Sequence, residues 1–195
     1  MNEISLSKRL TRSPRTPVGA ETGLPLAQFD AALHPLLKGT AALAPYLATL
    51  ITKEADWLAD AVAAPEAALA AVLAAPADLD EGTLNAGLRQ GKRRVALLSA
   101  LADLGGAWSL EEVTGALTDY ADAAAHAALR VAVGAQIRRG KLPGLTPEDA
   151  ETAGGMTVLA MGKMGAGELN YSSDIDLICL FDESRYSPDD FQEAR

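Results

Sequence analysis

The chain has 195 residues and a formal net charge of −9, with 17 Lys and Arg against 26 Asp and Glu. This acidic balance argues against nonspecific binding to nucleic acid, which depends on basic side chains that contact phosphates. A single cysteine, Cys179, excludes an intrachain disulfide and a cysteine-based zinc site. Residues 1–19 lack the apolar centre of a signal peptide, and charges and prolines interrupt the apolar run 58–77. We therefore expect a cytoplasmic protein with no membrane segment.

The first 25 residues contain prolines and glycines at short intervals. This composition predicts an irregular or loosely docked N-terminal tail, residues 1–25. The tail carries a small basic cluster, which a solvated surface explains most simply. Its members are Lys8, Arg9, Arg12 and Arg15.

Residues 26–150 read as a helical region. Pro45 and Pro65 are suited to the first turns of helices, and Leu47, Leu50 and Ile51 recur at helical spacing and should face a core. A further amphipathic helix is expected over 83–103. The basic side chains of this helix are Arg89, Lys92, Arg93 and Arg94. They could contact a phosphate or an acidic partner, but simple solvation is the favoured interpretation.

The clearest predicted helix runs from Ser109 to about Arg139. Ser109 and Glu112 have the spacing of a capping box, and Gly140 is a natural stop. His126 lies inside the alanine-rich part of this helix, where a partly buried structural histidine is expected rather than a ligand.

The pattern changes after Gly140. A connection rich in proline and glycine leads to a short apolar stretch, 156–161, which predicts a buried strand. A glycine-rich turn follows, and then a second predicted strand, 174–181. Residues 151–195 therefore read as the start of a mixed α/β domain that the chain does not complete, after a mainly helical region.

The Asp-x-Asp pair in the second predicted strand is the candidate for metal binding and catalysis. Alternation along a strand would place Asp174 and Asp176 on one face and Cys179 on the opposite, apolar face, where packing is its expected role. Two adjacent carboxylates repel each other unless a cation lies between them. Oxygen ligands of this kind suit Mg²⁺ or Mn²⁺, which can also share phosphate oxygens with a substrate. Asp174 and Asp176 are therefore the candidate metal ligands and catalytic residues.

The turn before this pair has the composition of a phosphate-binding loop. Its glycines allow a phosphate to approach backbone N–H groups, and its serines and lysine can offset negative charge. The candidate phosphate- and nucleotide-binding residues are Gly162, Lys163, Gly165, Gly167, Ser172 and Ser173. Neither the P-loop spacing nor the dinucleotide-binding spacing of glycines is present.

The stretch "GKMGAGELNYSSDIDLI" resembles the signature of the glutamine synthetase adenylyltransferase/adenylyl-removing enzyme family, in the polymerase β-like nucleotidyltransferase superfamily. The family pattern is Gly-Lys-Leu/Met-Gly, two variable residues, Glu-Leu-Asn, two more residues and Ser-Asp-x-Asp. The matching residues are Gly162, Lys163, Gly165, Glu168, Asn170, Ser173, Asp174 and Asp176. The preceding helical segments also resemble the region before the first catalytic domain of that family.

The resemblance implies the adenylyl-removing activity, in which phosphate attacks the AMP on a tyrosine of glutamine synthetase and ADP is released. It also implies Mg²⁺ at Asp174 and Asp176, phosphate groups at the glycine turn and Ser173, and regulation by the PII signalling protein. ATP belongs to the opposing adenylylation reaction. The superfamily uses a third carboxylate from a later strand, so the chain is expected to be an incomplete catalytic domain.

Two other interpretations remain open at this point. The chain could be a different polymerase β-like nucleotidyltransferase with another acceptor. It could also be a truncated, noncatalytic helical module or remnant that binds glutamine synthetase or a regulator.

Overall fold

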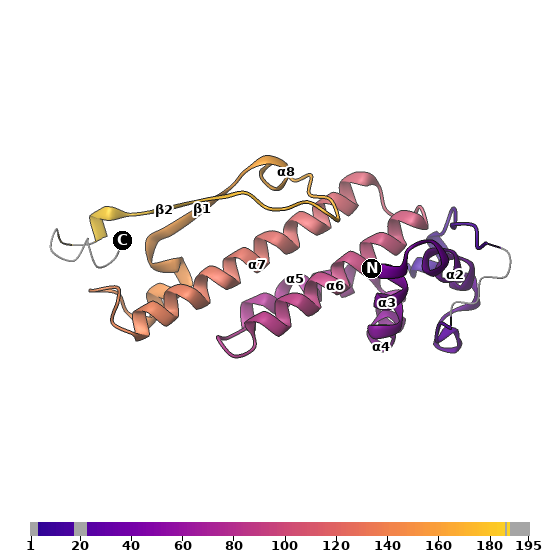
Figure 1. Cartoon of the computed structure of the whole chain (residues 1–195), viewed down its shortest axis with the longest axis horizontal. Helices are drawn as coiled ribbons and strands as arrows, with labels where there is room; N and C mark the ends of the chain where they lie inside the picture. The colour runs from indigo at the N-terminus through magenta and orange to yellow at the C-terminus, as the bar shows by residue number, and fades with distance from the viewer. Residues whose placement is uncertain (1–3, 18–22, 186, 188–195) are drawn as a thin grey trace.

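The computed structural model describes residues 4–17, 23–185 and 187. Parts of the predicted tail and of the predicted C-terminal domain (1–3, 18–22, 186 and 188–195) lie outside these residues. The chain is mainly helical, with a two-stranded antiparallel sheet near its C-terminal end (Figure 1). The α-helices are α1 (Leu6–Arg9), α2 (His34–Leu43), α3 (Pro45–Lys53), α4 (Ala55–Ala61), α5 (Pro65–Ala74), α6 (Leu84–Leu104), α7 (Leu110–Arg138) and α8 (Gly162–Gly165). The strands are β1 (Met156–Ala160) and β2 (Leu177–Phe181), and the 3₁₀ helices are η1 (Leu26–Gln28), η2 (Ala31–Leu33), η3 (Ala75–Asp78), η4 (Pro147–Gly155) and η5 (Glu183–Arg185).

Part of the N-terminal segment is docked on the helical body, whereas residues 10–17 have no regular secondary structure, as the composition predicts. Leu6 in α1 is completely buried, and its N–H donates to the carbonyl of Val62 at 2.8 Å. Arg9 forms an ion pair with Glu66, so this part of the basic cluster is not simply solvated. The sequence did not reveal this docking because its partners lie more than 50 positions along the chain.

The main core is built mostly from leucines of α1, α2, α3, α4 and α6, and α7 adds Val113 and Ala116. Leu50 and Ile51 are buried and Leu47 packs beside them, as their helical spacing predicts. The proline-initiated helices α3 and α5 begin at Pro45 and Pro65, because proline fixes a helical φ and lacks the N–H that a first turn cannot pair.

A break at Glu54 separates α3 from α4. Its backbone (φ −106°, ψ 21°) is non-helical, and its side chain is buried against α6. There it accepts hydrogen bonds from Arg93 at 2.8 Å and Arg94 at 3.0 Å. The prediction of a merely solvated basic face on α6 is therefore wrong for these two arginines.

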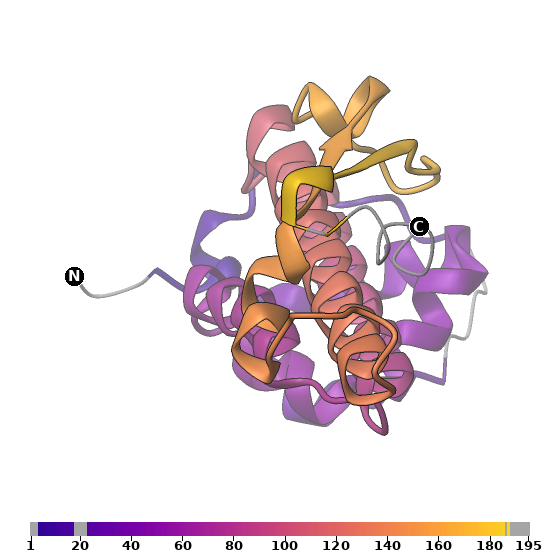
Figure 2. The same ribbon diagram turned by 90° about the vertical axis from the view of Figure 1, so that its left-hand side faces the viewer.

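Helices α6 and α7 are the two longest elements and lie side by side (Figures 1 and 2). The capping box predicted for α7 is confirmed: Ser109 Oγ accepts from the Glu112 N–H, and the Glu112 carboxylate accepts from the Ser109 N–H at 2.6 Å. Among the described helices, none combines the length and the apolar character that a membrane span requires.

The two strands form a hairpin that runs along α7, and in the view of Figure 1 α7 lies between the hairpin and helices α5 and α6. In its register, Val158 pairs with Cys179 and Ala160 with Leu177. The first strand lies where the sequence predicts it, but it is partly exposed rather than buried. The second strand begins at Leu177, three residues later than predicted. The proposed division of the chain into segments 1–25, 26–150 and 151–195 stays a prediction.

Candidate functional site

The glycine turn connects β1 to β2 through the single helical turn α8. Two of its glycines need a left-handed backbone, with φ of +57° at Gly162 and +73° at Gly167. Gly165 is required for a different reason, because a Cβ there would lie 2.3 Å from the carbonyl oxygen of Ala160. The turn is thus compact, and its predicted glycines each have a steric role in it.

Two buried side chains, Met164 and Leu169, hold the turn against the helical body. The N–H of Leu169 also donates a hydrogen bond of 3.1 Å to the buried Oγ1 of Thr118 on α7. That hydroxyl in turn donates to the carbonyl of Thr114 at 2.8 Å. Sequence reasoning missed Thr118, because nothing in its local helical pattern indicates a partner 51 residues away.

Asn170 organises the residues that lead to the carboxylates. Its Oδ1 accepts hydrogen bonds from the Ser172 N–H at 3.1 Å and from the Ser173 hydroxyl at 2.8 Å. Asn170 therefore braces this part of the turn internally. To donate to a phosphate, Ser173 must turn its hydroxyl away from Asn170, whereas the Ser172 hydroxyl makes no hydrogen bond within the described part of the chain. Lys163 is exposed at the start of the turn.

Asp174 and Asp176 are both exposed in the approach to β2. The carbonyl of Asp176 accepts from the N–H of Met161 at 2.9 Å, so hairpin pairing extends one step beyond the strand. The prediction of a shared face relied on strand alternation, which begins only at Leu177. Their arrangement as a pair of metal ligands stays a prediction.

An apolar groove of about 790 Å³ lies between the hairpin and helices α6 and α7. Ser173 and Asp174 line it, and Asp176 is not part of its lining. Its floor includes Tyr120, whose hydroxyl donates to the Leu88 carbonyl at 2.6 Å. Cys179 faces this apolar groove, but it is exposed, so the packing role expected for it is not met in this structure.

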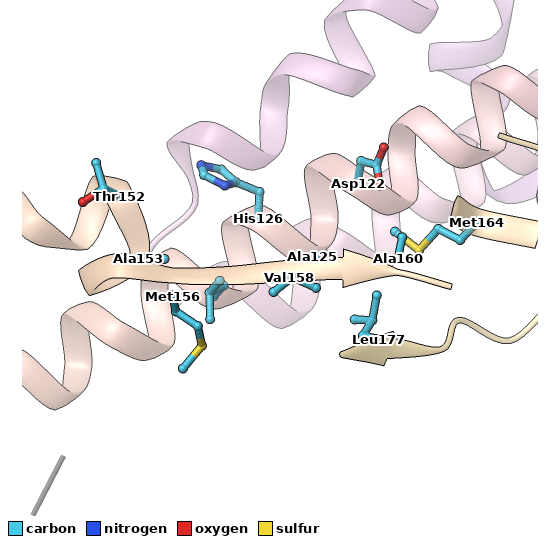
Figure 3. A pocket seen from close by; sticks show the side chains of 11 residues that line it. Asp122, Ala125, His126, Thr152, Ala153, Met156, Val158, Ala160, Met164 and Leu177 are labelled. Atoms are coloured by element: carbon cyan, nitrogen blue, oxygen red, sulfur yellow. The ribbon is translucent and has the colours of Figure 1, made fainter. Parts of the chain in front are cut away.

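A smaller cavity of about 250 Å³ lies between α7, η4 and the strands (Figure 3). Asp122 and His126, one turn apart on α7, line it together with Thr152. His126 is exposed rather than partly buried as expected. Burial first, and the neighbouring Asp119 charge second, raise the pKa of Asp122.

The carboxylate pair supplies hard oxygen donors, which fit Mg²⁺ when waters and substrate oxygens complete the coordination. No group of three or more His, Cys, Asp and Glu side chains is positioned to hold a metal ion among residues 4–17, 23–185 and 187. A third carboxylate for the site is therefore not provided by the part of the chain that the structure describes.

Comparison with known proteins adds independent information. The glutamate-ammonia ligase adenylyltransferase family, GlnE, matches residues 31–194. A bifunctional glutamine synthetase adenylyltransferase/adenylyl-removing enzyme from Bradyrhizobium diazoefficiens is 46% identical over 156 residues, which cover 75% of this chain and 15% of the relative. The enzyme of the same name from Caulobacter vibrioides is 44% identical over 169 residues, which cover 84% of this chain and 17% of the relative.

No solved structure matches the chain. The aligned part spans less than a fifth of the length of these relatives, as the coverages of 15% and 17% show. The match nevertheless extends over most of the chain, including the helical lead-in, the glycine turn and the Asp-x-Asp pair. The chain therefore belongs to the glutamate-ammonia ligase adenylyltransferase family.

Proposed function

We propose that the chain is part of an enzyme that regulates glutamine synthetase, and that it contributes the adenylyl-removing activity. The observation that carries the proposal is the placement of Ser173 and Asp174 at one groove directly after a tightly folded glycine turn. This arrangement offers phosphate donors and carboxylates in one short segment. The names of the relatives supply the target, glutamine synthetase, and the transferred group, AMP.

In the proposed reaction, inorganic phosphate attacks the phosphorus of AMP bound to a tyrosine of glutamine synthetase. The new phosphorus–oxygen bond forms ADP, and the tyrosine oxygen leaves and takes up a proton. Mg²⁺ or Mn²⁺ at Asp174 and Asp176 would supply stabilisation of the charge that develops on the phosphate oxygens.

The residues of the chain orient the phosphates. The N–H of Gly162 and the hydroxyls of Ser172 and Ser173 donate to phosphate oxygens. The N–H groups of Gly165 and Gly167 already donate to the carbonyls of Met161 and Met164, at 3.2 Å and 3.1 Å, so these two glycines shape the turn and let the phosphate approach it closely. Lys163 offsets part of the negative charge. Met164 and Leu169 fix the turn on the helical body, so the backbone of the turn is already in place when the substrate arrives, whereas the Ser173 hydroxyl must rotate away from Asn170.

Further assignments rest on the same family relationship. We propose that the segment is the beginning of a polymerase β-like α/β domain, that a third carboxylate comes from elsewhere in the working enzyme, and that the PII protein controls its activity. ATP and ADP are the proposed nucleotides. The cytoplasmic location and the absence of nucleic-acid partners stay predictions.

The test is phosphate-dependent ADP release from adenylylated glutamine synthetase by the gene product that carries this sequence. We expect Asp174→Asn and Asp176→Asn to reduce the rate at least about a hundredfold, since each removes a charge that would hold the metal. Asp182→Asn, beyond the end of β2, is the matched control and should retain activity.

Turnover by the control and its loss in both site variants would support the adenylyl-removing assignment. AMP transfer from ATP onto glutamine synthetase, without phosphate-dependent release, would assign the opposite activity. Binding of glutamine synthetase without turnover and without a Mg²⁺ requirement would instead support the noncatalytic binding module.

A further inference from the structure

A second candidate site lies at the opposite side of α6, where α3 meets α4. Glu54 at this junction is only 5% exposed in its side chain. Each of its carboxylate oxygens accepts from the Nε of one arginine, Oε1 from Arg93 and Oε2 from Arg94. One carboxylate thus holds two guanidinium groups next to each other.

The charges of this cluster do not balance. Arg93 and Arg94 are largely covered, with side chains 25% and 27% exposed, and they face one carboxylate between them. Two like charges that share a single counter-charge in a partly desolvated place leave one positive charge uncompensated. Lys53 and Asp56 also line the pocket, so the lining carries three positive side chains (Lys53, Arg93, Arg94) against two negative ones (Glu54, Asp56).

The guanidinium groups keep hydrogen-bonding capacity after they bind Glu54. An arginine offers five N–H donors in a planar fork, and both arginines use Nε for the carboxylate. Among the described residues, the side-chain hydrogen bonds of Arg93 and Arg94 are those from Nε to Glu54, and none is made by their Nη atoms. The Arg94 guanidinium also lies 5.0 Å from the centre of the Trp57 ring, and this stacking fixes its plane.

These groups surround an open pocket of about 320 Å³, which both arginines line together with Thr52, Trp57 and Gln90. The Thr52 hydroxyl already donates to the Ala48 carbonyl at 3.2 Å, so the donors that remain in the lining are the two arginines, the Lys53 ammonium and the Gln90 amide. Paired guanidinium groups match the geometry of phosphate and carboxylate oxygens.

We propose that Arg93 and Arg94 bind a small oxyanion, a phosphate or a carboxylate group, in this pocket. Glu54 positions the two arginines and prevents them from separating, and the ligand neutralises the remaining positive charge. The site lies on α6 and the α3–α4 junction, and none of the residues that line this pocket lines the groove beside Asp174. It is therefore distinct from the site of the proposed reaction and does not depend on that proposal.

Trp57 provides the readout, because a ligand that engages Arg94 changes the surroundings of its ring. In a Trp108→Phe background Trp57 is the single tryptophan, since the chain has two. We would titrate the whole chain with sodium phosphate and then with sodium acetate, with sodium chloride holding the ionic strength constant. A saturable change in fluorescence and a rise in Tm with ligand concentration are expected for phosphate, acetate or both.

The pattern of response assigns the ligand chemistry: saturation by phosphate alone indicates a phosphate site, and saturation by acetate alone a carboxylate site. Arg93→Gln should abolish saturation. Arg93→Lys, which keeps the charge but loses the fork, should weaken binding about tenfold. The matched control is Arg89→Gln, an exposed arginine on the same helix outside the pocket, and it should leave the affinity unchanged.

Circular dichroism would establish that each variant is folded. If Arg93→Gln does not fold, the comparison of Arg93→Lys with Arg89→Gln decides the question. Responses to phosphate and acetate no larger than that to chloride would overturn the proposal. Equal affinities in wild type, Arg93→Lys and Arg89→Gln would overturn it as well.

Discussion

The N–H of Leu169 donates a hydrogen bond to the Oγ1 of Thr118, and this bond joins the glycine turn to the middle of α7. Both residues are buried, so water does not replace the bond when it is lost. The position of the candidate phosphate-binding segment therefore depends on a helix residue far from it in sequence.

Thr118→Val should destabilise the protein by about 1–3 kcal/mol, because it keeps the side-chain shape but leaves the Leu169 N–H buried without an acceptor. Denaturant unfolding followed by circular dichroism measures the change. Thr49→Val is the control, since Thr49 also donates to a carbonyl four residues earlier but is exposed. Equal losses in the two variants would show that the contact to Leu169 adds nothing.

Glu66 should make stability depend on pH. Partial burial raises its pKa, but hydrogen bonds from Arg9 and from the Trp108 indole lower the pKa overall. A carboxyl with a lowered folded-state pKa stabilises the fold fully above the pKa of unfolded glutamate, about 4.3, and loses this contribution as the pH falls through the folded-state value.

Glu66→Gln should therefore lower Tm at neutral pH and approach the wild-type Tm as the solution becomes acidic. Thermal unfolding at a series of pH values tests this, with Glu168→Gln, an exposed glutamate, as the control. A difference between wild type and Glu66→Gln that stays constant at every pH would contradict the role of the ionised carboxylate.

Local signals in the sequence predicted the helices well. The helix starts depend on residues close to them in sequence: Ser109 with Glu112 for α7, Pro45 for α3 and Pro65 for α5. Signals of this kind can be recognised from a few neighbouring residues. The glycine turn and the first strand were visible for the same reason. The buried ion pairs of Glu54 and the docking of Leu6 could not be predicted, because their partners are set by how distant helices pack.

The arrangement of the candidate carboxylates, Asp174 and Asp176, could not be predicted either. The Asp-x-Asp pattern located the segment, but the start of the second strand was placed three residues too early. The second strand begins where its pairing with β1 begins, at the pair of Leu177 with Ala160. This register depends on how two separate segments meet, so the residue pattern of one segment cannot give it. The local pattern thus predicts a chemistry for Asp174 and Asp176, which stays a prediction, and it could not give their geometry.

The outer side of the hairpin is apolar, with Ile178 and Leu180 45% and 51% exposed. Exposed apolar strands favour pairing between copies. Ile178→Lys should therefore reduce self-association at high concentration, measured by analytical ultracentrifugation, with little loss of stability. Leu110→Lys is the control, because Leu110 is 73% exposed but isolated on α7, and it should leave self-association unchanged.

Gly165 and Gly115 should respond in opposite ways to substitution by alanine. In Gly165→Ala the new Cβ would lie 2.3 Å from the carbonyl oxygen of Ala160, so the backbone of the turn must shift. In Gly115→Ala, inside α7, the new Cβ meets no atom within 4 Å, so the substitution should stabilise the helix by about 0.5–1 kcal/mol.

Urea unfolding of both variants measures these changes, and Gly165→Ala should also weaken Mn²⁺ binding if the turn positions Asp174. A Gly165→Ala variant as stable as wild type, with unchanged Mn²⁺ affinity, would contradict the steric role of this glycine, because a backbone carbonyl cannot move aside as the end of a flexible side chain can.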